Sequence, residues 1–180
     1  MKRLLLGTLL VGALAGCGQG RAIFNVDAYS FMQGTGKDTI QYAIPPGGGS
    51  ASTVQKISLP PGFGKSIVDS VRITTGGADL FNSSGTGSIG FALFFAADSA
   101  STYTTPAALN IAATNVTGTQ GPVPVAITGD LSSTVNSLFT QQTVWVRIAA
   151  TGSNGSATPV IGKGVLTALV IRVVVEDKLF

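Results

Sequence analysis

The stretch Ser88–Ala97, which reads SIGFALFFAA, alternates large apolar side chains with small ones. Successive side chains of an extended strand point to opposite faces. One face then holds Ile89, Phe91, Leu93 and Phe95. The other face holds Gly90, Ala92, Phe94 and Ala96. This stretch predicts a β-strand that covers a hydrophobic core with its bulky face.

Seven more stretches share the short apolar pattern, and each is bounded by Gly, Pro, Asn or Ser. They are Ala22–Phe31, Thr39–Ile44, Thr53–Leu59, Ser66–Thr74, Pro122–Thr128, Thr143–Ala150 and Gly164–Glu176. In the last stretch, Val165 to Val175 is apolar on both faces apart from Thr167 and Arg172. That pattern predicts a central strand that is covered on both sides, or one whose outer face meets a partner.

One short helix is expected near 130–140, because Asp130 can cap it. Its apolar side chains recur at helical spacing: Leu131, Val135, Leu138 and Phe139. The stretch 98–119 is rich in Ala, Thr and Ser and indicates no clear element. About eight strands in some 160 residues predict an all-β fold, a β-sandwich of immunoglobulin-like or jelly-roll type.

The N-terminus has the three parts of a secretory signal. Lys2 and Arg3 precede a short apolar run, Leu4 to Leu14, which is too short to span a bilayer. The run ends in Leu14-Ala15-Gly16-Cys17, which resembles the lipobox of bacterial lipoproteins. This resemblance implies that residues 1–16 are removed as a signal peptide. It also implies that Cys17 carries a thioether-linked diacylglycerol and an N-acyl chain such as palmitate.

The resemblance implies an address as well. The residue after Cys17 is Gly18 rather than Asp, and lipoproteins of that type are generally sent to the outer membrane. We therefore expect a lipid-anchored protein of the cell envelope, with residues 17–21 as lipidated Cys and short tether. Residues 22–180 would form a single β-sandwich domain. A tether of that length reaches at most ~14 Å, so the domain would sit against the membrane surface.

The composition excludes several chemistries. The chain has no His and one Cys, which excludes Ser-His-Asp triads, His-ligated metals and a second thiol. The only Glu, Glu176, has no carboxylate partner suited to glycoside cleavage. Loss of Lys2 and Arg3 would leave nine basic against eight acidic residues, which gives no argument for nucleic acid. We expect no enzyme activity, no metal and no cofactor beyond the lipid on Cys17.

Two acidic positions invite a ligand-binding interpretation, and both favour a structural one. Asp69 is expected to share its strand face with Ile67, Val71 and Ile73, where a carboxylate usually bonds a turn amide. The expected loop Gly76–Gly85 holds Asp79 and Asn82, too few oxygens for Ca²⁺.

Trp145 and Arg147 form the strongest candidate contact surface. Both lie opposite the stripe of Val144, Val146 and Ile148, and Trp and Arg are the residues that most often anchor interfaces. Tyr103 is a further aromatic that could contact a ligand at a loop end. A core Trp under a loop, with Arg147 reaching to water, is the alternative interpretation.

Two functions follow as hypotheses. The first is a non-enzymatic lipoprotein that binds or scaffolds another envelope protein, or self-associates, close to the membrane. Its support is the low share of charged residues, 11%, and the apolar last strand. The alternative is a module that binds carbohydrate or a small ligand through Tyr103 or Trp145.

Overall fold

The computed structural model describes residues 20–59 and 67–177, so Cys17 and the predicted signal lie outside the described residues. Ten strands account for most of these residues. They are β1 (Gly20–Asp27), β2 (Thr39–Ile44), β3 (Gly49–Ser58), β4 (Ile67–Ser84), β5 (Thr86–Ala96), β6 (Leu109–Thr117), β7 (Gln120–Ala126), β8 (Gly129–Asp130), β9 (Thr143–Ser153) and β10 (Val160–Asp177). The helical elements are α2 (Ser132–Val135) and three 3-10 helices, Tyr29–Phe31, Ala100–Tyr103 and Leu138–Thr140.

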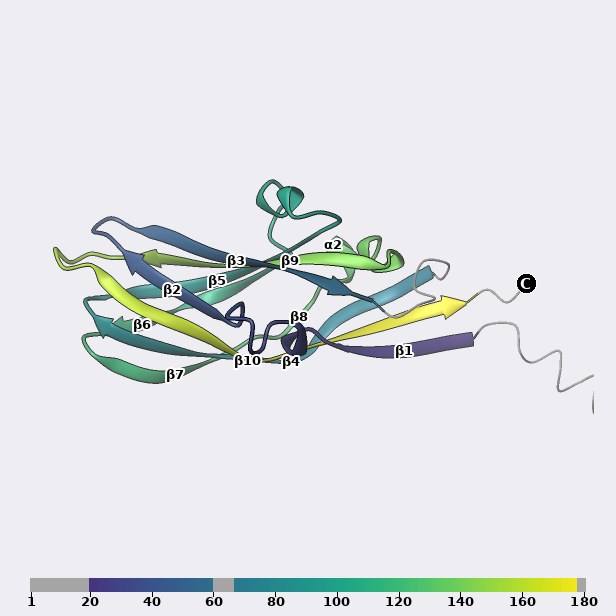
Figure 1. The fold of residues 1–180 in the computed structure, drawn as a ribbon, viewed down its shortest axis with the longest axis horizontal. Coiled ribbons are helices and arrows are strands. Elements are labelled where there is room, and N and C mark those ends of the chain that lie inside the picture. The colour runs from purple at the N-terminus through teal and green to yellow at the C-terminus, as the bar shows by residue number, and fades with distance from the viewer. Residues whose placement is uncertain (1–19, 60–66, 178–180) are drawn as a thin grey trace, which may run out of the picture.

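The strands form two antiparallel sheets that lie as two layers (Figure 1). Sheet A has the order β1-β10-β4-β7, with β2 also paired to β10 and β8 to β4. Sheet B has the order β3-β9-β5-β6. The first and last strands are neighbours, and most connections cross from one sheet to the other. This order is that of a jelly roll, which confirms the predicted β-sandwich and distinguishes between its two types.

β4 and β10 are the longest strands, with 18 residues each, and they pair along nearly their whole length. One edge of β10 is shared by two strands: β1 pairs with its last part and β2 with its first part. β10 is therefore central, as its apolar sequence predicts. Its inward side chains are buried, and Val165, Val170 and Val174 are half-buried on the outer face.

The core lies between the sheets, and β5 supplies much of it. The predicted bulky face is buried: Ile89, Phe91, Leu93 and Phe95 are at most 5% exposed. Phe95 packs against Phe139, with ring centroids 6.3 Å apart. Leu131, Val135 and Phe139 close the core from the segment where a helix was predicted. That helix is shorter than expected, since α2 has one turn and a separate 3-10 turn follows.

One predicted loop is wrong, and one unassigned stretch contains a strand. The expected loop Gly76–Gly85 is mostly strand, because β4 continues through it to Ser84. A Cβ at Gly76 would lie 2.4 Å from the Ile127 carbonyl oxygen, so glycine here allows the chain after β7 to approach rather than marking a turn. The unassigned stretch 98–119 contains β6, a sheet-edge strand whose alternation is interrupted by a bulge opposite Gly90.

The two ends of the described chain lie together. Gly20 pairs with Asp177, and Figure 1 shows the start of β1 beside the end of β10 at one end of the molecule. Gly20 and Arg21, expected in the tether, belong to β1. Among the described residues no helix is long and apolar enough to cross a membrane.

Candidate functional site

Arg147 lies between two aromatic rings on the outer face of sheet B. Its guanidinium carbon is 3.6 Å from the centre of the Phe94 ring and 4.8 Å from that of Tyr103. Its Nε also donates a hydrogen bond of 2.9 Å to the carbonyl oxygen of Thr102. Arg147 is only 9% exposed, whereas Tyr103 is 61% exposed. The stack therefore holds one face of an otherwise open tyrosine ring in place.

Strand pairing and one short turn build this stack. Phe94 and Arg147 are direct cross-strand partners on β5 and β9. Tyr103 comes from the connection between β5 and β6, which stands out from sheet B in Figure 1. Asp98 holds its start, because Oδ1 accepts from the Ser101 amide at 2.8 Å and Oδ2 from the Ser101 hydroxyl at 2.6 Å. These hydrogen bonds lower the pKa of Asp98.

Burial has an electrostatic consequence for Arg147. It lowers the pKa of the guanidinium, since the charged form loses hydration, and Tyr103 opposes that shift. The ring faces offer partial compensation through their negative quadrupole. Arg147 does not reach to water as the alternative interpretation supposed; it forms the centre of a stacked cluster.

Trp145 lies two residues away on the same face of β9. Its ladder partners are Ala96 on β5 and Lys56 on β3, and its side chain is half-buried. The structure thus places all three candidate residues on one outer face. It joins Tyr103 and Arg147 directly, and it keeps Trp145 beside them.

An open groove runs along the same face from this cluster toward the far end of β5. We call it the sheet B groove. Its floor is β5, where Ser88, Gly90 and Ala92 are small, and it ends at Phe94. Its remaining lining residues are Thr86, Gly87, Phe91, Asn110, Ile111, Ala113, Asn115, Val116, Thr117, Thr151, Gly152, Ser153, Gly155 and Ser156. None of these residues is charged.

Sequence reasoning identified the small face of β5 but missed this groove. The residues that form one wall, Asn110, Ala113 and Asn115, come from β6, which was not recognised as a strand. Phe94 was placed on the correct face without a role. The sequence does indicate a role for it. Phe94 is the single large side chain on the small face of β5, and such a ring marks where a loop can pack on the sheet.

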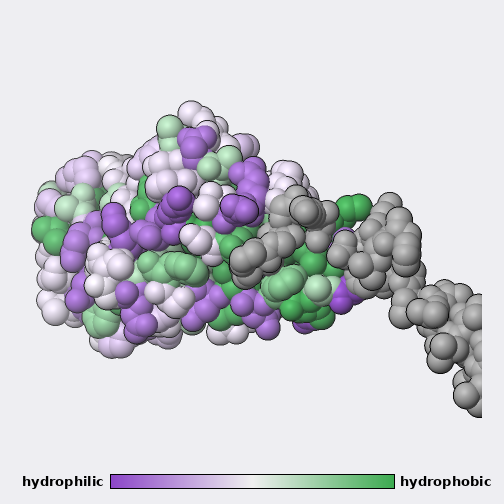
Figure 2. Space-filling model, turned by 45° about the vertical axis from the view of Figure 1, so that its right-hand side comes forward, coloured by the Kyte–Doolittle hydropathy of each residue, from purple (hydrophilic) through white to green (hydrophobic). Residues whose placement is uncertain are grey.

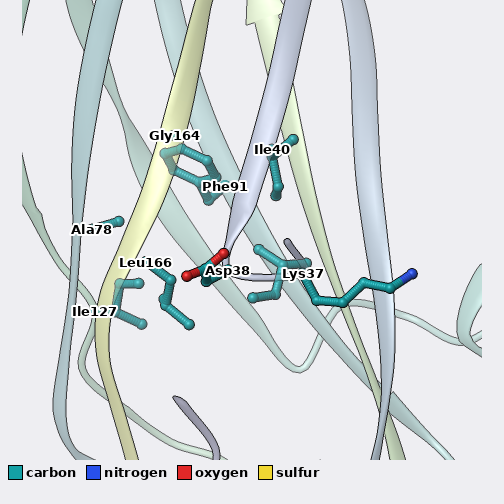
Figure 3. A pocket seen from close by; sticks show the side chains of 9 residues that line it. Lys37, Asp38, Ile40, Ala78, Phe91, Ile127, Gly164 and Leu166 are labelled. Atoms are coloured by element: carbon teal, nitrogen blue, oxygen red, sulfur yellow. The ribbon is translucent and has the colours of Figure 1, made fainter. Parts of the chain in front are cut away.

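The space between the sheets holds a small, mainly apolar cavity. Figure 3 shows a cavity there, lined mainly by carbon, with residues that include Ile40, Phe91 and Leu166. Its volume is about 20 Å³, room for about one water molecule. In Figure 3 the Asp38 carboxylate lies among the lining side chains, and the Lys37 side chain extends away from the cavity.

The outer face of sheet A carries exposed ion pairs. Arg21 bridges Asp69 at 2.9 Å and Glu176 at 3.1 Å, and Arg72 pairs with Asp130 at 2.8 Å. The expected position of Asp69 beside Val71 and Ile73 is wrong. A register shift between β10 and β4 lies next to it, so Asp69 faces outward while Val71 and Ile73 face the core.

Asn82, the amide of the second candidate pair, also has a structural role. Asn82 is buried in β4, and its Nδ2 donates to the carbonyl oxygens of Ser84, Gly85 and Gly118 at 2.6–3.1 Å. It therefore ties two turns together. Within residues 20–59 and 67–177, no group of three or more His, Cys, Asp or Glu side chains could hold a metal ion.

Comparisons with known proteins add little to this geometry. No family model and no curated protein matches the chain. One similar solved structure is that of the infectious bursal disease virus Gx strain, with 15% identity and a TM-score of 0.41. The match covers 88% of this chain but 36% of the viral one, so the chain spans about a third of that protein. Another is TmCBM61 in complex with beta-1,4-galactotriose, with 10% identity, 86% and 88% coverage and a TM-score of 0.32. At such low scores these likenesses carry no functional argument, and the fold stands on its own strand order.

Proposed function

We propose that this protein is a non-catalytic, lipid-anchored binding module of the bacterial cell envelope, and that it holds an uncharged carbohydrate chain in the sheet B groove. The groove carries this proposal. It is open, free of charged side chains, and lined by hydroxyl and amide groups; at its Phe94 end, Arg147 stacks on Phe94 and on the exposed ring of Tyr103. The carbohydrate hypothesis, second from the sequence alone, therefore becomes the first.

The chemistry of the groove fits a sugar. Hydroxyl and amide side chains both donate and accept hydrogen bonds, as sugar hydroxyls do. Ser88 and Ser153 already share a hydrogen bond of 2.7 Å across the floor. An aromatic ring with one free face offers an apolar surface for the C–H side of a pyranose. Tyr103 is such a ring, because Arg147 occupies only its inner side.

The anchor rests on the resemblance of Leu14-Ala15-Gly16-Cys17 to a lipobox. Two or more acyl chains are needed for stable attachment, and a lipidated Cys17 would supply them. The non-catalytic part rests on the sequence, which has no His. It rests also on the carboxylates Asp69, Glu176 and Asp130, which are engaged in ion pairs.

A glycan array tests the ligand class. The protein, extracted from membranes in mild detergent, is applied to neutral and charged glycans. We expect saturable binding to neutral chains. Tyr103→Ala should weaken it about tenfold, which corresponds to roughly 1.4 kcal/mol. Ala113→Trp should abolish binding, because Ala113 is an exposed wall residue and the larger ring would fill the groove.

Arg72→Ala is the matched control, since Arg72 lies exposed on the other sheet. It should leave glycan binding unchanged. Binding that survives both groove variants, or binding to charged glycans alone, would overturn the carbohydrate proposal.

A protein partner is the second candidate, and the half-buried outer valines of β10 favour it. Mass spectrometry of species that co-purify from mild detergent separates the two. One stoichiometric envelope protein, lost with Cys17→Ser, would favour scaffolding.

A further inference from the structure

Two exposed isoleucines lie at the end of the molecule where β1 begins. Ile23 is 54% exposed and Ile67 is 52% exposed. Both lie on the outer face of sheet A, on either side of β10, where Ile23 pairs with Val174 and Ile67 with Glu176. Figure 2 shows hydrophobic surface at this end of the molecule. Two branched apolar side chains so exposed at one end of a single sheet face suggest a surface that is covered in use.

Chain length says what can cover it. Three peptide units join Cys17 to Gly20, so their Cα atoms are at most ~11 Å apart. A lipid on Cys17 would therefore hold this end of the sandwich at the bilayer surface. The far end is distant, because β10 runs for 18 residues, roughly 55–60 Å as an extended strand.

The charges around the isoleucines suit phosphate-bearing headgroups. Arg72 and Arg172 are direct cross-strand partners, so two guanidinium groups project from neighbouring positions of the same face. Like charges placed this way repel each other, and the Asp130 carboxylate, 2.8 Å from Arg72, offsets part of that repulsion. Guanidinium groups bind phosphate through paired hydrogen bonds. The same face also carries the carboxylates of Asp69, Glu176 and Asp130, so its charges of both signs are balanced.

We propose that the outer face of sheet A, at the end formed by Ile23, Ile67, Val174, Arg72 and Arg172, rests on phospholipid headgroups. This inference rests on the proposed lipid anchor at Cys17. Ile23 and Ile67 enter the boundary between headgroups and acyl chains, and the arginines contact phosphates. Because the charges are balanced, contact does not depend on anionic lipid. The sheet B groove, on the opposite sheet, stays open to ligand.

Quenching by brominated lipids tests this contact. The lipidated protein is extracted, and the mass of its Cys17 peptide is measured in the same sample. The intact protein is then reconstituted into phosphatidylcholine vesicles with brominated acyl chains. Trp145 is the only tryptophan, so the variants are Ile23→Trp and Ile67→Trp in a Trp145→Phe background. Ile161→Trp is the matched control: Ile161 is also an exposed isoleucine (44%) on β10, but at the far end of the strand.

We expect fluorescence quenching at positions 23 and 67, none at 161, and no change when phosphatidylglycerol is added. If the protein is lipidated but shows no quenching at positions 23 and 67, the proposed contact of this face with lipid is overturned. The proposed lipid anchor is not affected by that result. Equal quenching at 161 would overturn it too, since the whole sheet would then lie on the membrane. An unlipidated Cys17 would overturn both the anchor and this inference.

Discussion

Arginines on the two outer faces of the sandwich have opposite surroundings. On sheet B, Arg147 is stacked between Phe94 and Tyr103 and almost fully buried. On sheet A, the Arg21 and Arg72 side chains are 61% and 63% exposed and make ion pairs. The strand positions are alike, since each arginine points outward from a strand. The difference is the connection between β5 and β6, which covers part of sheet B.

That cover determines what each face can do. Over sheet B it makes a small secondary core, in which Thr102 and Arg147 are buried, and leaves the groove beside it. On sheet A, the charged side chains stay in water and pair with one another. An outward arginine thus becomes a structural anchor or a surface charge according to the loop above it. Three measurements separate these roles.

The largest effect is expected at Arg147. Arg147→Ala should lower the free energy of unfolding by about 2–3 kcal/mol, since it removes two cation–π contacts, a hydrogen bond and buried packing. Arg147→Lys should also lower the free energy of unfolding, but by a smaller amount, because an ammonium cannot stack as a planar group. Urea unfolding followed by Trp145 fluorescence measures both. If Arg147→Ala lowered the free energy of unfolding by no more than Arg21→Ala, the β5–β6 connection over sheet B would contribute no stability.

A smaller effect is expected at Arg21. Arg21→Ala should cost less than about 1 kcal/mol, because both of its ion pairs are exposed. High salt should shrink this cost, since exposed charges are screened. The cost of Arg147→Ala should not change with salt. A salt-independent loss at Arg21 would mean that its side chain acts by packing against Ile23 rather than by charge.

The smallest effect is expected from pH. Hydrogen bonds from Ser132 lower the pKa of Asp130, with a further contribution from Arg72, and Ser101 does the same for Asp98. Their stabilisation is present above the ordinary carboxyl pKa of about 3.9 and is lost as pH falls through the lower folded value. Urea midpoints should therefore stay level from pH 8 to 5, since the chain has no His, and then fall.

Asp130→Asn is the variant that tests this assignment. It should reduce the free energy of unfolding at pH 7. At pH 3 the difference in this free energy between the variant and the unmodified protein should be smaller. A gap that widens in acid would contradict the sign.

Much of the fold could be predicted from local pattern. Thr39–Ile44 matches β2, and the alternation in Ser88–Ala97 and Thr143–Ala150 identified the buried faces correctly. The failures have physical causes. Gly76 and Gly77 resemble a turn in sequence, but both lie within β4, where Gly76 allows close approach of the Ile127 backbone and Gly77 that of the Thr167 side chain. The bulge in β6 breaks the period of two on which strand recognition depends.

The candidate site could be predicted only in part. Placing Trp145 and Arg147 on one face required only the alternation of β9. Joining Tyr103 to Arg147 required contact between residues 44 positions apart, which no local pattern contains. The groove needed β6 beside β5, and so depended on the strand that was missed.

The sequence by itself determined that this chain forms strands, which of their faces are apolar, and which chemistries its residues cannot perform. These properties follow from side-chain type and from a period of two, and both are local. Only the tertiary structure decided the jelly-roll order, the burial of Arg147 and the uncharged groove. Those depend on which strands lie side by side and on where one connection folds back, and the core as a whole sets that outcome.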